Sequence, residues 1–175
     1  MKPERNFSEK AQEYFMGIAL KEAQKTLSKG EFPVGCIMVS QNEVIATGAR
    51  RSSAGTSANE IDHAEMIALR ELWKLGEGAD PSRITVYSTM EPCLMCFAAL
   101  ILAGIKSIVY AYEDVMGGGT NADLSGLPPL YSGAGISVVP GVLREESLAL
   151  FRKFFSDPAN LYWKGSLLAG YTLSQ

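Results

Sequence analysis

The chain has 175 residues, of which 47% are hydrophobic and 20% charged, and its formal net charge is −3. These values fit a single globular domain over residues 1–175 and leave little room for two full domains. Three cysteines are too few for a disulfide scaffold. The chain has no apolar run of roughly 20 residues, which argues against a membrane span. Its acidic balance argues against a broad basic surface for nucleic acid.

The first part of the chain predicts a helix followed by a β-hairpin. Ser8 is a typical helix-capping residue, and the apolar residues after it recur at helical spacing as far as Gly30. Residues 34–39 form a nearly continuous apolar run, which is typical of a strand buried on both faces. A polar break separates this run from a second short strand over 43–48, so we expect the two strands to pair.

The rest of the chain alternates between strands and helices. We expect strands over 83–89, 105–112 and 135–140, and helices over 62–76, 92–104 and 143–155. Asp62 should cap the first of these helices, and Pro92 suits the first position of the second. The Gly- and Pro-rich residues 113–135 should form a long loop with a turn of helix inside it. This order predicts a three-layer α/β/α sandwich with a core over about 8–155. The apolar tail, residues 156–175, should pack on the body or on a second subunit.

Two of the three cysteines, Cys93 and Cys96, follow Pro92 and lie three residues apart. On a helix they would share one face near the N-terminus, where the helix dipole favours the thiolate form that binds metals. The pair alone leaves three possibilities open: a metal site, a redox dithiol, and two small side chains buried in the core.

His63, the only histidine, falls at the start of the preceding predicted helix. Helices that follow adjacent parallel strands begin at the same edge of a sheet, so His63 could meet Cys93 and Cys96 there. The alternative is a hydrogen-bonded structural histidine. One imidazole, two thiolates and an open fourth position are typical of catalytic zinc. Glu65 is then either a general acid/base beside a zinc-bound water or a first-turn glutamate favoured by the helix dipole. Such a site would attack a carbon bearing an amino group and release ammonia.

The motifs HAE (63–65) and PCLMC (92–96) resemble the signature of the zinc-dependent cytidine/deoxycytidylate deaminase superfamily. The segments EFPVGCIMV, STMEPCLMCFAAL and GVLREESLALFRKFF resemble parts of bacterial tRNA adenosine deaminases, and guanine deaminases partly share the second. The resemblance extends from about Gly30 to Phe155. It implies a central mixed five-stranded sheet and a hydrolytic deaminase that converts an amino-substituted nucleobase to its keto form.

The resemblance also implies roles for individual residues. Zn²⁺ would be bound by His63, Cys93 and Cys96, and Glu65 would shuttle the proton. Backbone amides near Ala64 and Cys93 would polarise the base. The substrate pocket would involve Pro33, Val34, Gly35, Arg50, Ala64, Glu91 and Pro92.

Three features depart from the pattern. Family members usually carry asparagine two residues after Gly48, where this chain has Arg50, so that contact is missing or is replaced by Arg50 or Arg51 reaching a phosphate or a carbonyl. The loop before His63 is longer than usual, and the tail is apolar where tRNA-acting members often end in basic residues. Motif similarity favours wobble adenosine in a tRNA anticodon loop, whereas charge and the missing asparagine favour a free purine or pyrimidine base or nucleoside.

Two other classes of function stay open. One is a non-catalytic relative that holds structural zinc and serves as a partner subunit, although the retained Glu65 argues against it. The other is a cysteine redox protein, against which His63 and Glu65 argue together. Like most members of the superfamily, the chain should be a homodimer, with the helix from Cys93 to Ala103 and the tail at the interface. Few cysteines and no apolar leader in the first ten residues predict a cytoplasmic protein without a membrane segment.

Overall fold

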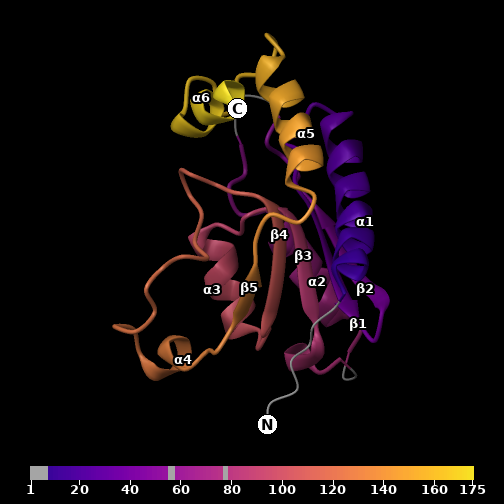
Figure 1. Cartoon of the computed structure of the whole chain (residues 1–175), viewed down its shortest axis with the longest axis vertical. Helices are drawn as coiled ribbons and strands as arrows, with labels where there is room; N and C mark the ends of the chain where they lie inside the picture. The colour runs from indigo at the N-terminus through magenta and orange to yellow at the C-terminus, as the bar shows by residue number, and fades with distance from the viewer. Residues whose placement is uncertain (1–7, 55–57, 77–78) are drawn as a thin grey trace.

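The computed structural model describes residues 8–54, 58–76 and 79–175, which form a five-stranded sheet between two layers of helices (Figure 1). The strands lie in the order β2 (Glu43–Ala49), β1 (Gly35–Ser40), β3 (Thr85–Met90), β4 (Ser107–Tyr112) and β5 (Ser137–Val139). Strand β1 is antiparallel to both of its neighbours, whereas β3, β4 and β5 are parallel. The predicted three-layer sandwich and mixed sheet are confirmed.

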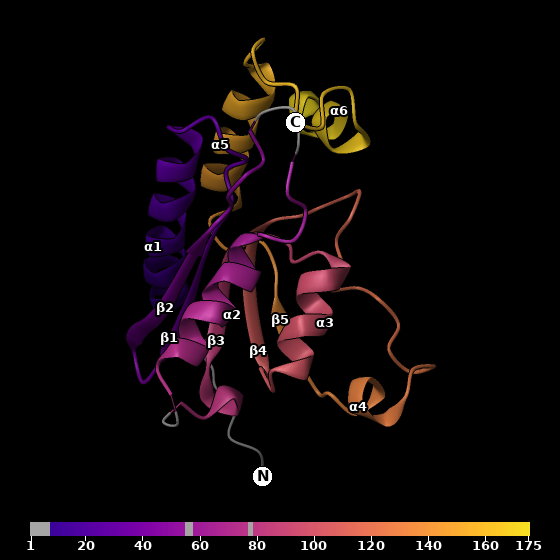
Figure 2. The same ribbon diagram turned by 180° about the vertical axis from the view of Figure 1, so that it is seen from behind.

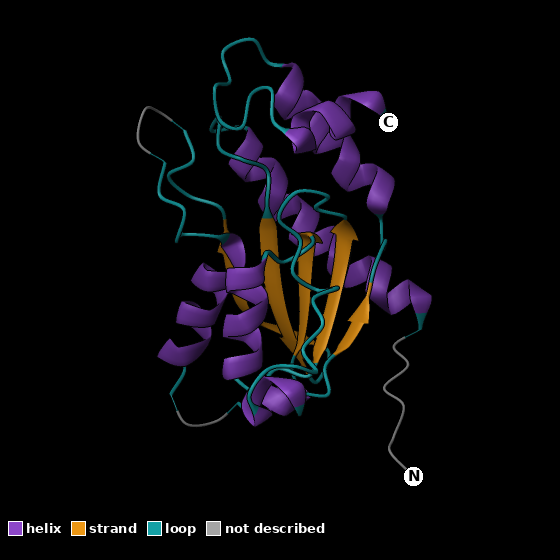
Figure 3. Cartoon of the chain, turned by 90° about the vertical axis from the view of Figure 1, so that its left-hand side faces the viewer, coloured by secondary structure: helices purple, strands orange, loops and turns teal. Residues whose placement is uncertain are grey.

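Helices α1 (Glu9–Leu27) and α5 (Arg144–Ser156) lie on one side of the sheet, and α2 (Ala64–Lys74) and α3 (Leu94–Leu102) lie on the other (Figures 2 and 3). The expected β-hairpin and the helices on both sides of the sheet are therefore present. None of the helices in the described part of the chain has the length and apolarity needed to cross a membrane.

Strand β1 shows why the sheet needs cover on both faces. Cys36 and Met38 pack in the core cluster that includes α2 and α3, whereas Ile37 and Val39 pack with α1. Because successive side chains of a strand point to opposite faces, an uninterrupted apolar run requires helices on both sides. The predicted burial of this strand on both faces is confirmed.

Two glycines let helices approach the sheet closely. A Cβ atom on Gly35 would lie 2.7 Å from the backbone nitrogen of Ala23 in α1, and one on Gly48 would lie 2.6 Å from that of Ala68 in α2. Any side chain at either position would push a helix outward. Gly48 therefore sets the position of α2.

The prediction that Asp62 caps α2 is wrong, because His63 is the N-cap and α2 begins one residue later. The Asp62 carboxylate instead accepts hydrogen bonds from Arg70 (2.6 Å) and from the side chain of Asn59 (2.9 Å). A carboxylate engaged in these two contacts is held away from the backbone N–H groups of the first turn.

The prediction that Pro92 occupies the first position of α3 is also wrong. Cys93 is the N-cap of α3, and the helix begins at Leu94. The carbonyl of Pro92 accepts a hydrogen bond from the backbone nitrogen of Gly119 (2.9 Å), so this stretch pairs with the loop that follows β4 instead of starting the helix. The expected turn of helix inside that loop is α4 (Pro129–Ser132), and a 3₁₀ turn, Pro81–Arg83, precedes β3.

The apolar tail packs on the body of the same chain, which confirms one of the two expected arrangements. Its helix α6 (Leu167–Ser174) lies against α5 at the end of the molecule opposite α4 (Figure 1). The hydroxyls of Tyr112 and Thr172 lie 2.9 Å apart, and Tyr171 donates a 2.6 Å hydrogen bond to Glu113. These contacts join the tail to the end of β4.

Candidate active site and metal centre

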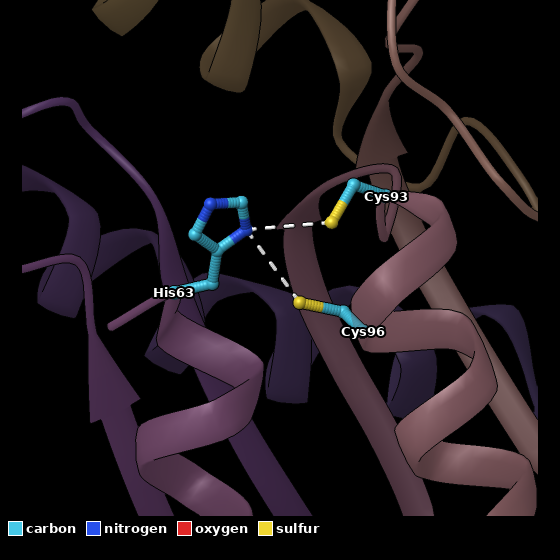
Figure 4. A group of neighbouring side chains, drawn as sticks. All are labelled: His63, Cys93 and Cys96. Atoms are coloured by element: carbon cyan, nitrogen blue, oxygen red, sulfur yellow. Dashed lines mark hydrogen bonds between the residues drawn. The ribbon is translucent and has the colours of Figure 1, made fainter. Parts of the chain in front are cut away.

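The imidazole of His63 and the thiols of Cys93 and Cys96 converge at the N-terminal ends of α2 and α3 (Figure 4). His63 Nδ1 lies 3.5 Å from Cys93 Sγ and 3.6 Å from Cys96 Sγ. Tetrahedral zinc, with Zn–S near 2.3 Å and Zn–N near 2.0–2.1 Å, places nitrogen and sulfur ligands about 3.6 Å apart. The donor set therefore fits zinc in both chemistry and spacing.

The topology explains this convergence, with one difference from the prediction. Strands β2 and β3 lead into α2 and α3, and they run in the same direction, but β1 lies between them. The prediction that the two strands are adjacent is therefore wrong. The helices still begin at one edge of the sheet and lie side by side (Figure 2). This is because β1 is antiparallel to both β2 and β3, so β2 and β3 are parallel to each other.

The two thiols differ in the direction of their pKa shifts. Hydrogen bonding with Cys96 and with His63 lowers the pKa of Cys93 to about 4, although burial acts in the opposite direction. The pKa of Cys96 is raised, first by its hydrogen bond to Cys93 and then by burial. The lowered pKa favours Cys93 as the thiolate, which is the form that binds metal.

Glu65, in the first turn of α2, is buried, with 2% of its surface exposed. Burial raises the pKa of its carboxyl group, while its own backbone N–H and the charge of His63 lower it in part. Ser88 Oγ on β3 donates a 2.9 Å hydrogen bond to Glu65 Oε1. A carboxyl group with a raised pKa is suited to take up and release a proton near neutral pH.

A cavity of about 250 Å³ opens at this site. The candidate site residues from the sequence that line it are Val34, Arg50, His63, Ala64, Glu65, Glu91 and Cys93. Cys96, Pro33, Gly35 and Pro92 are outside this lining. The amide of Gly35 instead donates a 3.0 Å hydrogen bond to Thr89 Oγ1, within the sheet.

Arg50 lines the cavity, but its guanidinium group is bound within the chain. The residue is only 3% exposed. Its Nη1 donates to the carbonyl of Asn59 (2.6 Å), and its Nη2 donates to Glu60 Oε2 (3.1 Å) and to the hydroxyl of Tyr162 (3.2 Å). Arg50 therefore joins the end of β2 to the loop before His63 and to the tail.

Glu91 also lines the cavity while it holds the loop after β4. Its carboxylate accepts hydrogen bonds from the backbone nitrogens of Asp114 (3.2 Å) and Thr120 (3.3 Å). The glycine run explains how this loop comes so close, because a Cβ on Gly119 would lie 2.6 Å from the backbone nitrogen of Leu94. The loop therefore packs directly against the start of α3.

Several lining residues were missed by sequence reasoning. Glu60 precedes the metal cluster, whereas Asp114, Met116 and Gly117 come from the loop after β4, and Tyr162, Trp163 and Leu168 come from the tail. The aromatic pair in the tail and the glycine run in the loop were visible in the sequence. Neither pattern indicates which part of the fold the segment will contact.

Comparison with known proteins places this geometry in a family. Residues 9–112 match the model of the cytidine and deoxycytidylate deaminase zinc-binding region. A tRNA-specific adenosine deaminase from Streptococcus pyogenes is 33% identical over 155 residues, which cover 85% of this chain and 92% of that protein.

Solved structures agree. One from a study of A-to-I editing by tRNA:A34 deaminases at the wobble position has a TM-score of 0.67 and 29% identity, covering 78% of this chain and 98% of its own. A mutant protein in complex with 8-azaguanine has a TM-score of 0.67 and 26% identity, covering 82% of this chain and 84% of its own. The chain belongs to the cytidine and deoxycytidylate deaminase zinc-binding family and is a zinc-dependent hydrolytic deaminase.

Proposed function

We propose that His63, Cys93 and Cys96 bind the catalytic Zn²⁺ and that Glu65 is the proton shuttle. The observation that carries this proposal is the convergence of one imidazole nitrogen and two sulfurs at zinc-ligand spacing beside a buried carboxyl group, at a cavity. Bound zinc supplies a Lewis acid that makes water nucleophilic near neutral pH.

The residues around the metal would each have a separate role in proton transfer or in binding the base. Glu65 would carry one proton of the attacking water to a ring nitrogen of the base and the other to the departing amino group, so that ammonia leaves and a carbonyl remains. Backbone N–H groups at Ala64 and Cys93 lie at the starts of α2 and α3, where they have no partner within the helix, and they would donate to the base. Val34 and Met90 supply apolar wall against which a base can rest.

The substrate that we propose first is the wobble adenosine in a tRNA anticodon loop. The Streptococcus pyogenes relative, at 33% identity over most of both chains, supports this choice. The target adenosine would have to leave its stack and enter the cavity as a flipped base, as other base-modifying enzymes require. The net charge of −3 predicts few phosphate contacts and therefore a shallow dependence of binding on salt.

A free purine or pyrimidine base, such as guanine or cytosine, or its nucleoside is the second candidate substrate. Tyr162, Trp163 and Leu168 of the tail line the cavity, so a ligand has to fit beside them, which favours a small ligand. The structural neighbour in complex with 8-azaguanine supports the same class.

Ammonia release measured in parallel on tRNA, adenosine, adenine, guanine, cytosine and cytidine separates the two candidates. We expect turnover on tRNA and a loss of that turnover when the wobble adenosine is replaced by guanosine. Turnover on a free base with none on tRNA would select the second candidate. A zinc-loaded protein that released ammonia from none of these would contradict the assigned roles.

We further propose that residues 1–175 form one deaminase domain, and that the protein is a cytoplasmic homodimer. Exposed apolar side chains on α3, Leu94 (60%) and Leu102 (64%), support an interface on that helix. Light scattering at micromolar concentration should give twice the chain mass of 18.9 kDa. A mass of one chain would contradict the dimer.

A further inference from the structure

Glu60 lies next to the metal cluster, on the side of His63 that faces away from the sulfurs. Its Oε2 atom is 3.8 Å from His63 Nε2, while Nδ1 of the same ring faces Cys93 and Cys96 (Figure 4). This separation is longer than a hydrogen bond but within the range of electrostatic attraction. The side chains of Glu60 and His63 are 52% and 25% exposed, so the pair lies where the metal site meets solvent.

The same oxygen is held by two further residues. Arg50 Nη2 donates to Glu60 Oε2 at 3.1 Å, and the Tyr162 hydroxyl donates to it at 2.9 Å. Arg50 Nη2 also donates to the Tyr162 hydroxyl at 3.2 Å, so the three groups close a ring of hydrogen bonds. The guanidinium carbon of Arg50 lies 5.8 Å from the centre of the Tyr162 ring, which adds a cation–π contact.

Arg50 is the buried member of this group of three residues. The Arg50 side chain is 2% exposed, and a buried guanidinium requires a nearby carboxylate. Its Nη1 is occupied by the carbonyls of Asn59 and Arg51, so its position is fixed by the backbone of the loop that leads to His63. Glu60 is thus held from one side by the buried Arg50 and from the other by the tail residue Tyr162.

We propose that Glu60 is a positioning residue for the metal ligand His63, and that Arg50 and Tyr162 hold its carboxylate in place. This inference rests on the proposed role of His63 as a zinc ligand. A carboxylate at Nε2 keeps the proton on that nitrogen and leaves Nδ1 free to bind the metal. The attraction also favours the ring orientation in which Nδ1 points toward the two sulfurs.

The arrangement joins the tail to the metal site. Tyr162 lies about one hundred residues after Glu60 in the sequence, yet its hydroxyl contacts the carboxylate beside His63. The Tyr162 ring also packs edge-to-face with Phe32, with ring centres 5.3 Å apart, which restricts the position of the hydroxyl. Tail residues therefore act on how firmly zinc is held, in addition to shaping the cavity.

The test uses the full-length zinc-loaded protein with Glu60→Gln and Tyr162→Phe. Zinc release to a chelator should be roughly 10-fold faster in Glu60→Gln, because lost outer contacts of a histidine ligand cost this much in metal affinity. Tyr162→Phe keeps the ring and loses one hydrogen bond, so release should be about 2- to 10-fold faster. The ligand-field absorption of the Co²⁺-loaded protein should change in both variants, which a purely structural role would not cause.

Matched controls are Glu43→Gln, on the exposed edge of β2, and Tyr14→Phe, on the exposed side of α1. Both should keep the wild-type release rate and Co²⁺ spectrum. Wild-type release and spectra in Glu60→Gln and Tyr162→Phe would overturn the inference while leaving zinc binding by His63 intact. If Glu60→Gln does not fold, the result for Tyr162→Phe decides. If His63→Ala retained zinc as wild type does, the proposed function itself would fall, and this inference with it.

Discussion

Ser88 on strand β3 holds the carboxyl group of Glu65 on helix α2 through a 2.9 Å hydrogen bond between two buried side chains. The contact links α2 to β3, which follows it in the sequence after a loop and a 3₁₀ turn. It fixes the rotamer of the residue to which we assign proton transfer. The hydroxyl also lowers the pKa of Glu65, against the larger effect of burial.

Ser88→Ala should lower kcat about 2- to 10-fold, because one hydrogen bond of ordinary net strength is lost. Zinc content should stay at one per chain, since Ser88 is not part of the donor set. Steady-state ammonia release and elemental analysis measure the two quantities. Ser107→Ala, at the start of β4, is the control. An unchanged kcat would show that the backbone alone positions Glu65.

Glu65→Gln should reduce kcat about 10²- to 10⁴-fold, the usual contribution of a positioned acid/base. The variant should still bind zinc, because the three donors are untouched. Glu71→Gln, on the same helix with a side chain that is 42% exposed, should retain full activity. Activity within a few-fold of wild type in Glu65→Gln would remove the proton-shuttle role.

Gly48→Ala should destabilise the fold by about 1–3 kcal/mol, the usual cost of overpacking. The new methyl group would meet the carbonyl of Ala64 and push α2, and His63 with it, away from the sheet. Thermal unfolding and zinc titration should both report the damage. Gly17→Ala in α1 has open space around it and should raise stability slightly. Equal behaviour of the two variants would contradict the packing argument.

Acid should weaken the attachment of the tail. Burial raises the pKa of Glu113, but hydrogen bonds from Arg144 and Tyr171 outweigh it and hold the pKa at about 2, below the ordinary value of 4.5. The folded state therefore gains stability from this group above about pH 4.5, and the gain is lost as the pH falls toward 2.

Glu113→Gln should accordingly be less stable than wild type at pH 7, and the difference should shrink to near zero at pH 2. Urea unfolding at a series of pH values measures it. Glu145→Gln, whose carboxylate contacts the same Arg144 but is largely exposed, should show a much smaller pH-dependent difference. A difference for Glu113→Gln that stayed constant from pH 7 to pH 2 would rule out its ionisation as the cause.

The fold could be predicted from the sequence where hydrophobic pattern and motifs indicated the same element. The apolar run 34–39 and the two motifs at helix starts required a buried strand and two helices at one sheet edge, and the structure has them. The failures were local. Asp62 has the chemistry of a cap, but Arg70 engages its carboxylate, and that contact depends on where α2 brings Arg70.

About half of the residues that line the cavity could not be predicted from the sequence, for a different reason. Tyr162 and Asp114 belong to segments without periodicity, and their place depends on long-range contacts that no local pattern encodes. Arg50 was recognised as unusual from the motif, but its partners Glu60 and Tyr162 lie 10 and 112 residues away in the sequence.

The family match ends at Tyr112, yet six residues that line the cavity lie beyond that boundary: Asp114, Met116, Gly117, Tyr162, Trp163 and Leu168. A chain trimmed to residues 9–112 would keep the three metal donors and lose these six residues of the cavity wall. Protein engineering should therefore treat helix α6 as part of the catalytic unit. An affinity tag belongs at the N-terminus, because Gln175 at the C-terminus accepts a hydrogen bond from Arg144.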